Sequence, residues 1–393
     1  MHQLRVYKIL RADVRKQKIK KDGIVVNQDK TRICIMLGAL YEGGIGRVAS
    51  IMMNSLSKRE NLEIHAMLYA PPKGPEIYEL SSDVIKSYLL DEHVNMQTAL
   101  LKKHAIKKLK KYLHENQIDI VIACGDLFYI VALVAGKLSG TKVICWDHTN
   151  MFSNTDQKFQ RITRETGATF CDYNLVLTKA ALEYYEKYHK LKKNYQIYNP
   201  VDQKAMVDCD YAEDSKKIIS VGRLSYQKNF SRLLDIASVV FKKHPDWTWH
   251  IYGSGDNLKE LEEKKNSLNL QNNVFFEGQV SNIYELYREY AFIVMTSRYE
   301  GFPMTLLEGA GSGLPMVSFD VQTGPNEIIV DGENGFLCDK DSDAEMVTRI
   351  NGLIENPELR KKLSVGSKKT AEKFNLQTIT DQWIELIERV VAR

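Results

Sequence analysis

The distribution of apolar residues predicts a chain of alternating strands and helices. Short apolar runs typical of buried strands recur from Thr31 onward, and segments with helical spacing separate them. In the first half these runs are RICIML, EIHAMLY, DIVIACG and KVICWDH. In the second half they are KIISVGR, WTWHIYGSG, NVFFEG, AFIVMTS and LPMVSFD. Such alternation predicts an α/β fold in which helices cover parallel sheets.

The alternation pauses at Asn199-Pro200, which predicts a division into two doubly wound domains. Proline cannot continue a helix and biases the residue before it toward an extended conformation, so this pair is a natural linker. We expect a first domain over residues 31–199 and a second over residues 200–375. The amphipathic segment 376–393 is expected to form a C-terminal helix that packs back toward the first domain.

Composition narrows the class of protein. The chain has 393 residues, of which 44% are apolar and 26% charged, as in soluble proteins with more than one core. No apolar run approaches the ~18 residues of a membrane span, and residues 1–30 form a basic extension without the apolar core of a signal peptide. The six cysteines are scattered without a Cys-x-x-Cys pair, so we expect free buried thiols in a reducing cytoplasm.

Charge is distributed unevenly along the chain. The first 200 residues hold 31 lysines and arginines against 20 acidic residues, although the net charge of the whole chain is only +4. Six of these lysines fall in LLKKHAIKKLKKYL, residues 100–113, beside an apolar stripe of Leu101, Ile106, Leu109 and Leu113. An ordinary surface helix with a solvated basic face explains this pattern, and so does a helix that faces anionic lipid headgroups.

The most informative motif is EGFPMTLLE, which runs from Glu300 to Glu308 and follows the predicted strand AFIVM after four intervening residues. Pro303 suits the first position of a helix, because its missing N–H would be unpaired there in any case. The unpaired N–H groups of Met304 and Thr305 would form an anion-binding site at the N-terminus of this helix. The two carboxylates can accept hydrogen bonds from sugar hydroxyls. The alternative is a helix-terminal acid followed by a solvated one. The small residues GAGSG that follow favour close packing against a ligand.

Two cations follow another predicted strand, in SVGRLSYQKN. Gly222-Arg223 ends the strand, and Lys228 lies five residues further on. Cations at the carboxyl end of a strand can hold a diphosphate and offset the charge that gathers on it as a bond breaks. A solvated basic loop explains the pair equally well.

Glycine-rich turns follow two further strands. YEGGIGR contains Gly43, Gly44 and Arg47, and YGSGDNL contains Gly253. Glycines let the backbone approach a phosphate closely, although a tight turn without a ligand has the same composition. Neither turn has the G-x-G-x-x-G spacing of a dinucleotide site, so each is a weak signal.

His148 follows the predicted strand KVICWDH. A single histidine is more often structural than catalytic, so this position alone is a modest candidate for ligand contact. No second histidine or cysteine stands at metal-ligand spacing, and we do not expect a built-in metal site. All these features come directly after strands, where open parallel sheets bind their ligands.

Together these motifs resemble the retaining glycosyltransferases of family four, which have the GT-B fold of two facing Rossmann-like domains. The resemblance extends over nearly the whole chain from Thr31, and residues 1–30 depart from it. Its most specific element is the Glu-x7-Glu motif, here Glu300 to Glu308, and VGRLSYQKN, EGGIGR, IYGSG and FDVQTGPNEII accompany it. The last block is similar to that of transferases that use UDP-galactose, UDP-N-acetylgalactosamine or related UDP-hexoses.

The resemblance implies a role for each candidate residue. Arg223 and Lys228 would hold the donor diphosphate, Glu308 would bind the ribose hydroxyls, and Glu300 would bind a hydroxyl of the transferred sugar. His148 would lie beside that sugar. The remaining donor-binding positions would close and line the site: Gly43, Gly44, Arg47, Gly222, Gly253, Gly301, Phe302, Pro303, Met304 and Thr305.

The implied reaction is transfer of a hexosyl or N-acetylhexosaminyl unit from a UDP-sugar to a glycan hydroxyl, with retained configuration and no cofactor. The acceptor would be a glycan or lipid-linked saccharide of the cell surface, built on the cytoplasmic face, with peripheral contact to anionic membrane and none to nucleic acid. A nucleotide-sugar epimerase or a phosphorylase would share two such domains, but no lysine stands in an obvious pyridoxal-phosphate context. A non-catalytic sugar-binding partner is the remaining alternative, and the complete set of charged motif residues argues against it.

Overall fold

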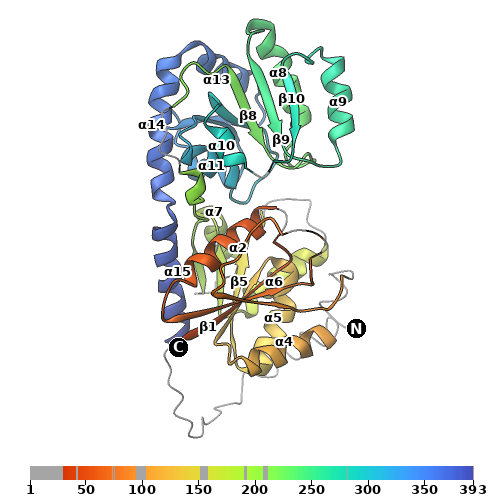
Figure 1. Ribbon diagram of the computed structural model, residues 1–393, viewed down its shortest axis with the longest axis vertical. Coiled ribbons are helices and arrows are strands. Elements are labelled where there is room, and N and C mark those ends of the chain that lie inside the picture. The colour runs from red at the N-terminus through yellow and green to blue at the C-terminus, as the bar shows by residue number, and fades with distance from the viewer. Residues whose placement is uncertain are drawn as a thin grey trace.

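The computed structural model describes residues 30–40, 43–72, 74, 76–93, 103–150, 158–189, 193–206, 211–280 and 282–392. Figure 1 shows two α/β domains, one above the other, with the helices of the C-terminal segment along one side. Residues 1–29 of the basic extension, Leu101 and Lys102 lie outside the described residues.

The first domain is built on a seven-stranded sheet in the order β3-β2-β1-β4-β5-β6-β7. All neighbouring strands are parallel. The strands are β1 (Thr31–Leu37), β2 (Leu62–Leu68), β3 (Val84–Tyr88), β4 (Ile120–Cys124), β5 (Lys142–Asp147), β6 (Tyr173–Val176) and β7 (Asn194–Gln196). The helices are α2 (Gly43–Leu56), α4 (Lys103–Glu115), α5 (Tyr129–Ser139), α6 (Lys158–Phe170) and α7 (Lys179–His189).

The second domain repeats this plan with a six-stranded parallel sheet in the order β10-β9-β8-β11-β12-β13. Its strands are β8 (Lys217–Val221), β9 (Thr248–Tyr252), β10 (Val274–Gly278), β11 (Phe292–Met295), β12 (Met316–Asp320) and β13 (Gly335–Asp339). Its helices are α8 (Phe230–Lys243), α9 (Leu258–Ser267), α10 (Ile283–Tyr287), α11 (Met304–Gly311), α12 (Pro325–Ile328), α13 (Asp343–Glu355) and α14 (Pro357–Lys373). The predicted α/β architecture with two doubly wound, Rossmann-like domains is confirmed.

Each apolar run expected to form a strand contains one, because a strand buried on both faces needs an almost continuous apolar sequence. Four strands were not predicted: β3, β6, β7 and β13. β3 has exposed residues at its second and third positions, and β6 and β7 have only four and three residues. Strands as short or as exposed as these three do not produce a long apolar run. This reason does not apply to β13, which has five residues, three of them buried.

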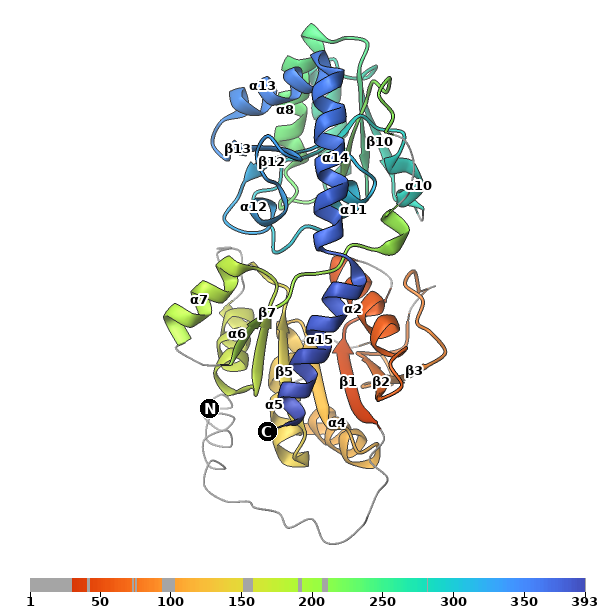
Figure 2. The same ribbon diagram turned by 90° about the vertical axis from the view of Figure 1, so that its left-hand side faces the viewer.

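The C-terminal segment connects the two domains. α14 lies on the second domain, and α15 (Leu376–Val391) lies on the first, as Figure 2 shows from the side of these helices. The side chain of Asn375 caps α15 by accepting a hydrogen bond from the backbone N–H of Thr378. Trp383 packs edge-on against Trp146 of β5, with ring centroids 4.6 Å apart. The hydroxyl of Thr380 is hydrogen-bonded to the hydroxyl of Ser55 in α2, with the two oxygens 2.7 Å apart.

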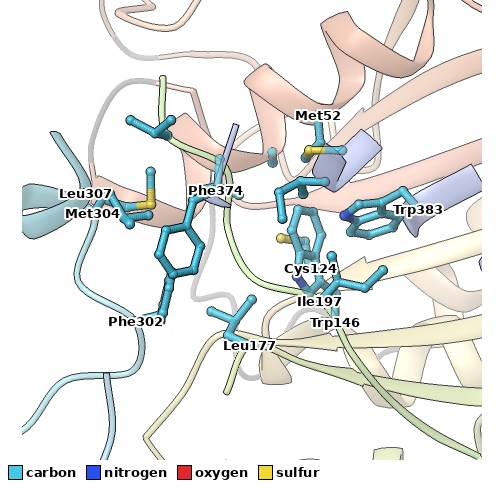
Figure 3. Close-up of a cluster of buried hydrophobic side chains, with 14 of the residues drawn as sticks. Met52, Cys124, Trp146, Leu177, Ile197, Phe302, Met304, Leu307, Phe374 and Trp383 are labelled. Carbon is cyan, nitrogen blue, oxygen red and sulfur yellow. The ribbon is translucent and has the colours of Figure 1, made fainter. Parts of the chain in front are cut away.

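One apolar cluster extends through both domains. Phe302, Met304 and Leu307 of the second domain lie in it together with Trp146 and Leu177 of the first (Figure 3). The aromatic rings of Tyr198, Phe302 and Phe374 pack together where the chain passes between the domains. Their ring centroids are 5.1 to 5.6 Å apart. Because burying one large apolar side chain contributes about 1.5–3 kcal/mol, this shared cluster stabilises the relative position of the domains.

The basic helix α4 lies at the end of the first domain that is remote from the second (Figures 1 and 2). It buries Ala105, Leu109 and Leu113. Lys103, Lys107, Lys110 and Lys111 are exposed. Within the described part of the chain, no helix combines the length and apolar character that a membrane crossing needs. Five described cysteines are free and buried, and Cys209 lies outside the described residues.

Candidate active site between the domains

A cleft of about 780 Å³ opens between the two domains where the strands of both sheets end. Every candidate residue from the sequence lines it: Gly43, Gly44, Arg47, His148, Gly222, Arg223, Lys228, Gly253, Glu300, Gly301, Phe302, Pro303, Met304, Thr305 and Glu308. A second hollow of about 810 Å³ lies around Lys217, Thr248 and Glu289 and contains none of them. It surrounds the first residues of β8 and β9, at the end where parallel sheets do not bind ligands.

Glu300 lies on the turn after β11 and is only 5% exposed. Its carboxylate accepts a hydrogen bond from the Lys228 ammonium at 2.7 Å. Its backbone carbonyl accepts two more, from the Thr323 hydroxyl and, at 2.7 Å, from the side-chain amide of Asn150 in the first domain. The contacts therefore fix both the backbone and the carboxylate of this turn.

Glu308 lies in α11 with its side chain fully buried. One oxygen pairs with the Arg47 guanidinium of α2, and the other accepts a hydrogen bond from the Tyr287 hydroxyl at 2.9 Å. Burial raises the pKa of the Glu308 carboxyl, and Arg47 and Tyr287 offset part of that rise. The alternative of a solvated Glu308 is therefore wrong, and the pair with Arg47 joins the two domains across the cleft.

Arg47 is the first domain's main polar contribution to the cleft. Burial alone would lower the pKa of Arg47, but Glu308 and three neighbouring tyrosines raise it. Its guanidinium lies over the rings of Tyr78 and Tyr284, at 5.5 and 5.6 Å from their centroids. These contacts hold the cation in one position.

Arg223 differs from the other cations of the cleft. It is exposed and has no ion-pair partner among the described residues, whereas Arg47 and Lys228 each pair with a glutamate. Among the described residues that line the cleft, Arg223 at the end of β8 is therefore a cation without an ion-pair partner, which favours an anionic ligand.

Gly222 and Gly253 must be glycines for the packing of the protein itself, because a side chain at either position would clash with neighbouring atoms. A side chain at residue 253 would place its Cβ 2.0 Å from the Gly222 carbonyl oxygen, and the φ of Gly253 is +141°. A Cβ at residue 222 would lie 2.9 Å from Cε of Lys228. These two glycines let the ends of β8 and β9 lie together and leave room for the lysine. In contrast, Gly43 has a φ of +85° and open space around it.

The N-terminus of α11 differs in one detail from the sequence prediction. Pro303 is not the first helical residue: its ψ of 106° is extended, and the helix begins at Met304. The backbone N–H groups of Met304 and Thr305 donate to no described residue. They remain available for an anion, as expected for the first turn of a helix.

His148 lines the cleft as a neutral ring. Burial lowers the pKa of its imidazole to about 3. Nε2 lies 3.2 Å from Sγ of Cys124, whose pKa burial raises, so the protonated thiol can donate to the ring. The ring also packs on Trp146, with centroids 4.5 Å apart. At neutral pH His148 can offer a hydrogen bond but no charge.

Several lining or supporting residues were not identified from the sequence, notably Tyr78, Asn150, Gln279, Tyr287 and Thr323. Four of them are single polar residues outside a motif, so spacing carries no signal for them, and Thr323 lies in the block FDVQTGPNEII without having been singled out. Across the described ranges, no group of three or more histidine, cysteine or acidic residues could hold a metal ion.

Two family models match the chain, one described as Glycosyltransferase Family 4 over residues 42–204 and one as Glycosyl transferases group 1 over residues 201–370. The amylovoran biosynthesis glycosyltransferase AmsD of Erwinia amylovora is 30% identical over 364 residues, which cover 89% of this chain and 97% of that protein. An α-1,4-N-acetyl-D-galactosaminyltransferase of Campylobacter jejuni, whose name includes a PP-undecaprenol saccharide, is 26% identical over 368 residues, 91% of this chain and 99% of that protein.

The fold comparison agrees with these matches. The structure of Anabaena HepE in complex with UDP-glucose has a TM-score of 0.74 and covers 91% of this chain and 99% of that one, at 18% sequence identity. This likeness supports the GT-B fold. The chain belongs to the glycosyltransferases of family four.

Proposed function

We propose that the protein is a retaining glycosyltransferase that moves a hexosyl or N-acetylhexosaminyl unit from a UDP-sugar to a hydroxyl group of a glycan acceptor. The observation that carries this proposal is the convergence of three features in one cleft: the N-terminus of α11, the exposed Arg223, which has no ion-pair partner in the described part of the chain, and the buried carboxylates of Glu300 and Glu308. A UDP-sugar offers a diphosphate, a ribose diol and hexose hydroxyls, so it has a group for each feature.

The diphosphate would lie between Arg223 and the first turn of α11. Cleavage of the donor leaves UDP with about one more negative charge, and cations and helix dipoles aimed at that charge lower the barrier. The Lys228 ammonium pairs with the Glu300 carboxylate at 2.7 Å and lines the same cleft as Arg223, so it is the second cation proposed to contact the diphosphate. The chain therefore supplies positive charge at the leaving group from its own residues.

Glu308 is the proposed ribose acceptor. A carboxylate has about four lone-pair sites, and Arg47 and Tyr287 engage one on each oxygen. The remaining sites can accept bonds from both hydroxyls of a vicinal diol. Glu300 has a corresponding role toward a hydroxyl of the transferred sugar, with Lys228 and Gln227 beside it.

The proposed mechanism is attack from the same face of the sugar. The acceptor oxygen forms the new bond to the anomeric carbon while the bond to the phosphate breaks, and the acceptor proton passes to the departing phosphate. A two-step route would need a free carboxylate nucleophile beside a second acid or base. Among the described residues that line the cleft, the only carboxylates are Glu300 and Glu308, and both are paired with cations.

The proposed acceptor is a lipid-linked saccharide or another precursor of a surface glycan on the cytoplasmic face of the membrane. The name of the Campylobacter relative includes such a lipid-linked saccharide, and AmsD is named for the biosynthesis of amylovoran. The exposed lysines of α4 support peripheral contact, because each lysine near an anionic leaflet contributes about 1 kcal/mol, screened by salt. We expect flotation with phosphatidylglycerol liposomes at low salt and release at high salt. Failure to float at low salt would remove the support for membrane contact.

The experiment that tests the proposed function is a donor screen with purified protein. UDP-, GDP- and dTDP-sugars are incubated without acceptor, and slow hydrolysis is followed by released nucleotide. We expect release from a UDP-hexose or UDP-N-acetylhexosamine. UDP binding without release from any donor, even with lipid-linked acceptors present, would favour a non-catalytic sugar-binding partner.

A further inference from the structure

The segment 323–327 of the block FDVQTGPNEII reaches both the site and the other domain. Glu327 lies in α12 of the second domain, but its carboxylate accepts three hydrogen bonds from the first domain. The donors are the backbone N–H of Lys179 at 2.9 Å, that of Ala180 at 3.3 Å, and the Tyr198 hydroxyl at 2.7 Å. The proposed donor chemistry uses none of these contacts.

These contacts place an anion at the start of α7. The first N–H groups of a helix have no partner inside it, and a carboxylate there satisfies them and interacts favourably with the helix dipole. The first domain supplies only part of this cap, since the Thr178 hydroxyl accepts from the N–H of Ala181 at 3.1 Å. Lys179 and Ala180 bond instead to the second domain. Separating the domains would expose both N–H groups to water.

The same segment supports the Glu300 turn. Thr323 donates to the Glu300 carbonyl, which also accepts from Asn150 of the first domain. Gly324 has a φ of +96°, and a Cβ at that position would lie 2.9 Å from the Gly301 carbonyl oxygen. The segment therefore lies directly against the backbone of the Glu-x7-Glu motif, a few residues from the carboxylate that holds α7.

We propose that Glu327 is a positioning residue that couples closure of the two domains to the placement of the Glu300 turn. While the Glu327 carboxylate is bonded to α7, the side-chain amide of Asn150 can donate to the Glu300 carbonyl. The Thr323 hydroxyl donates to the same carbonyl from the second domain. The turn then has its donor-binding geometry only while the domains are closed. The effect on transfer rests on the proposed function, whereas the coupling itself can be measured without any sugar.

Hydrogen exchange followed by mass spectrometry tests the coupling in the ligand-free protein. Glu327→Ala is compared with wild type and with Asn326→Ala, whose side-chain amide donates to Asp320 and to the Val321 carbonyl of its own domain. We expect faster exchange in Glu327→Ala at the start of α7, residues 179–184, and also in the Glu300 turn, residues 299–306. The amides of α9, which lies in the second domain away from these contacts, should exchange at the wild-type rate. Asn326→Ala should show wild-type exchange in all segments.

Kinetics give the second measurement. Turnover of Glu327→Ala should fall about tenfold, which corresponds to a barrier raised by about 1.4 kcal/mol. Calorimetric affinity for UDP should fall by clearly less than turnover, because Arg223 and Glu308 still contact the nucleotide. Faster exchange confined to residues 179–184 would overturn the proposal, because Glu327 would then only cap a helix. Unchanged exchange at both segments would overturn it as well.

Two further variants keep the test decisive. If Glu327→Ala does not fold, Tyr198→Phe removes one of the three hydrogen bonds and should change the same two segments by a smaller amount. Glu327→Gln keeps one acceptor oxygen and should lie between wild type and alanine. If the wild-type protein transfers no sugar, the proposed function fails, but the exchange pattern still decides the coupling.

Discussion

The ion pair between Arg47 and Glu308 gives the most specific prediction for stability. Arg47→Met keeps an apolar stem of similar length and leaves the Glu308 carboxylate with Tyr287 as its remaining polar partner. Removing one partner of a buried pair typically costs about 3–5 kcal/mol. The Arg47 side chain is 23% exposed, and Glu308 can take up a proton, so we expect a loss of about 2 kcal/mol in the free energy of unfolding at about pH 8.

The sign of the pH dependence follows from the pKa of Glu308. Burial raises the pKa of this carboxyl in the folded protein, and loss of Arg47 raises it further. A carboxyl whose folded pKa lies above its unfolded pKa favours folding at acid pH, and this contribution is lost as pH rises through the folded value. The defect of Arg47→Met should therefore be small near about pH 5 and largest near about pH 8.

Urea unfolding at both pH values measures this effect, with Glu308→Gln and the double variant as controls. Glutamine cannot ionise, so the double variant should recover at least half of the stability that Arg47→Met loses at the higher pH. Equal losses at both pH values, with no recovery in the double variant, would refute the reasoning.

The remaining predictions concern the chemistry of the cleft. Arg223→Ala and Lys228→Ala should each lower transfer by about a hundredfold, the usual scale for losing one preorganised charge contact; near wild-type turnover in a folded variant would exclude the diphosphate role. Glu308→Gln should weaken calorimetric binding of UDP, whereas Glu300→Gln should mainly slow transfer, and equal losses of UDP affinity would contradict this division. His148, with a pKa of about 3, should add no inflection to the pH–rate profile near about pH 6.5, where an unperturbed imidazole titrates. A limb at that pH that disappears in His148→Asn would contradict its neutral state.

The strands that build the cleft could be predicted because burial on both faces forces a continuous apolar run. β4 and β12 show this clearly, since all five residues of β4 and the first four of β12 are buried. β3 and β7 could not be predicted in this way. Their residues are partly exposed, and their pairing depends on neighbouring strands that are distant in the sequence.

The site was predictable to the extent that its chemistry lies in short motifs. Glu300 precedes α11 and Glu308 lies within it, and the small residues that follow favoured a ligand there, so the local sequence identified both as candidates. Their partners Arg47 and Asn150 come from the other domain, 261 and 150 residues away in sequence. Which cation pairs with which carboxylate depends on the packing of the two domains, and no local pattern records it.

The configuration of the first sugar released from the donor distinguishes a retaining transferase from an inverting one. Proton NMR follows the purified protein with a UDP-α-hexose that it hydrolyses, before the free sugar equilibrates. We expect the α-anomer to form first, together with UDP. Initial formation of the β-anomer, or the absence of UDP release from every UDP-sugar, would contradict a retaining transferase in this cleft.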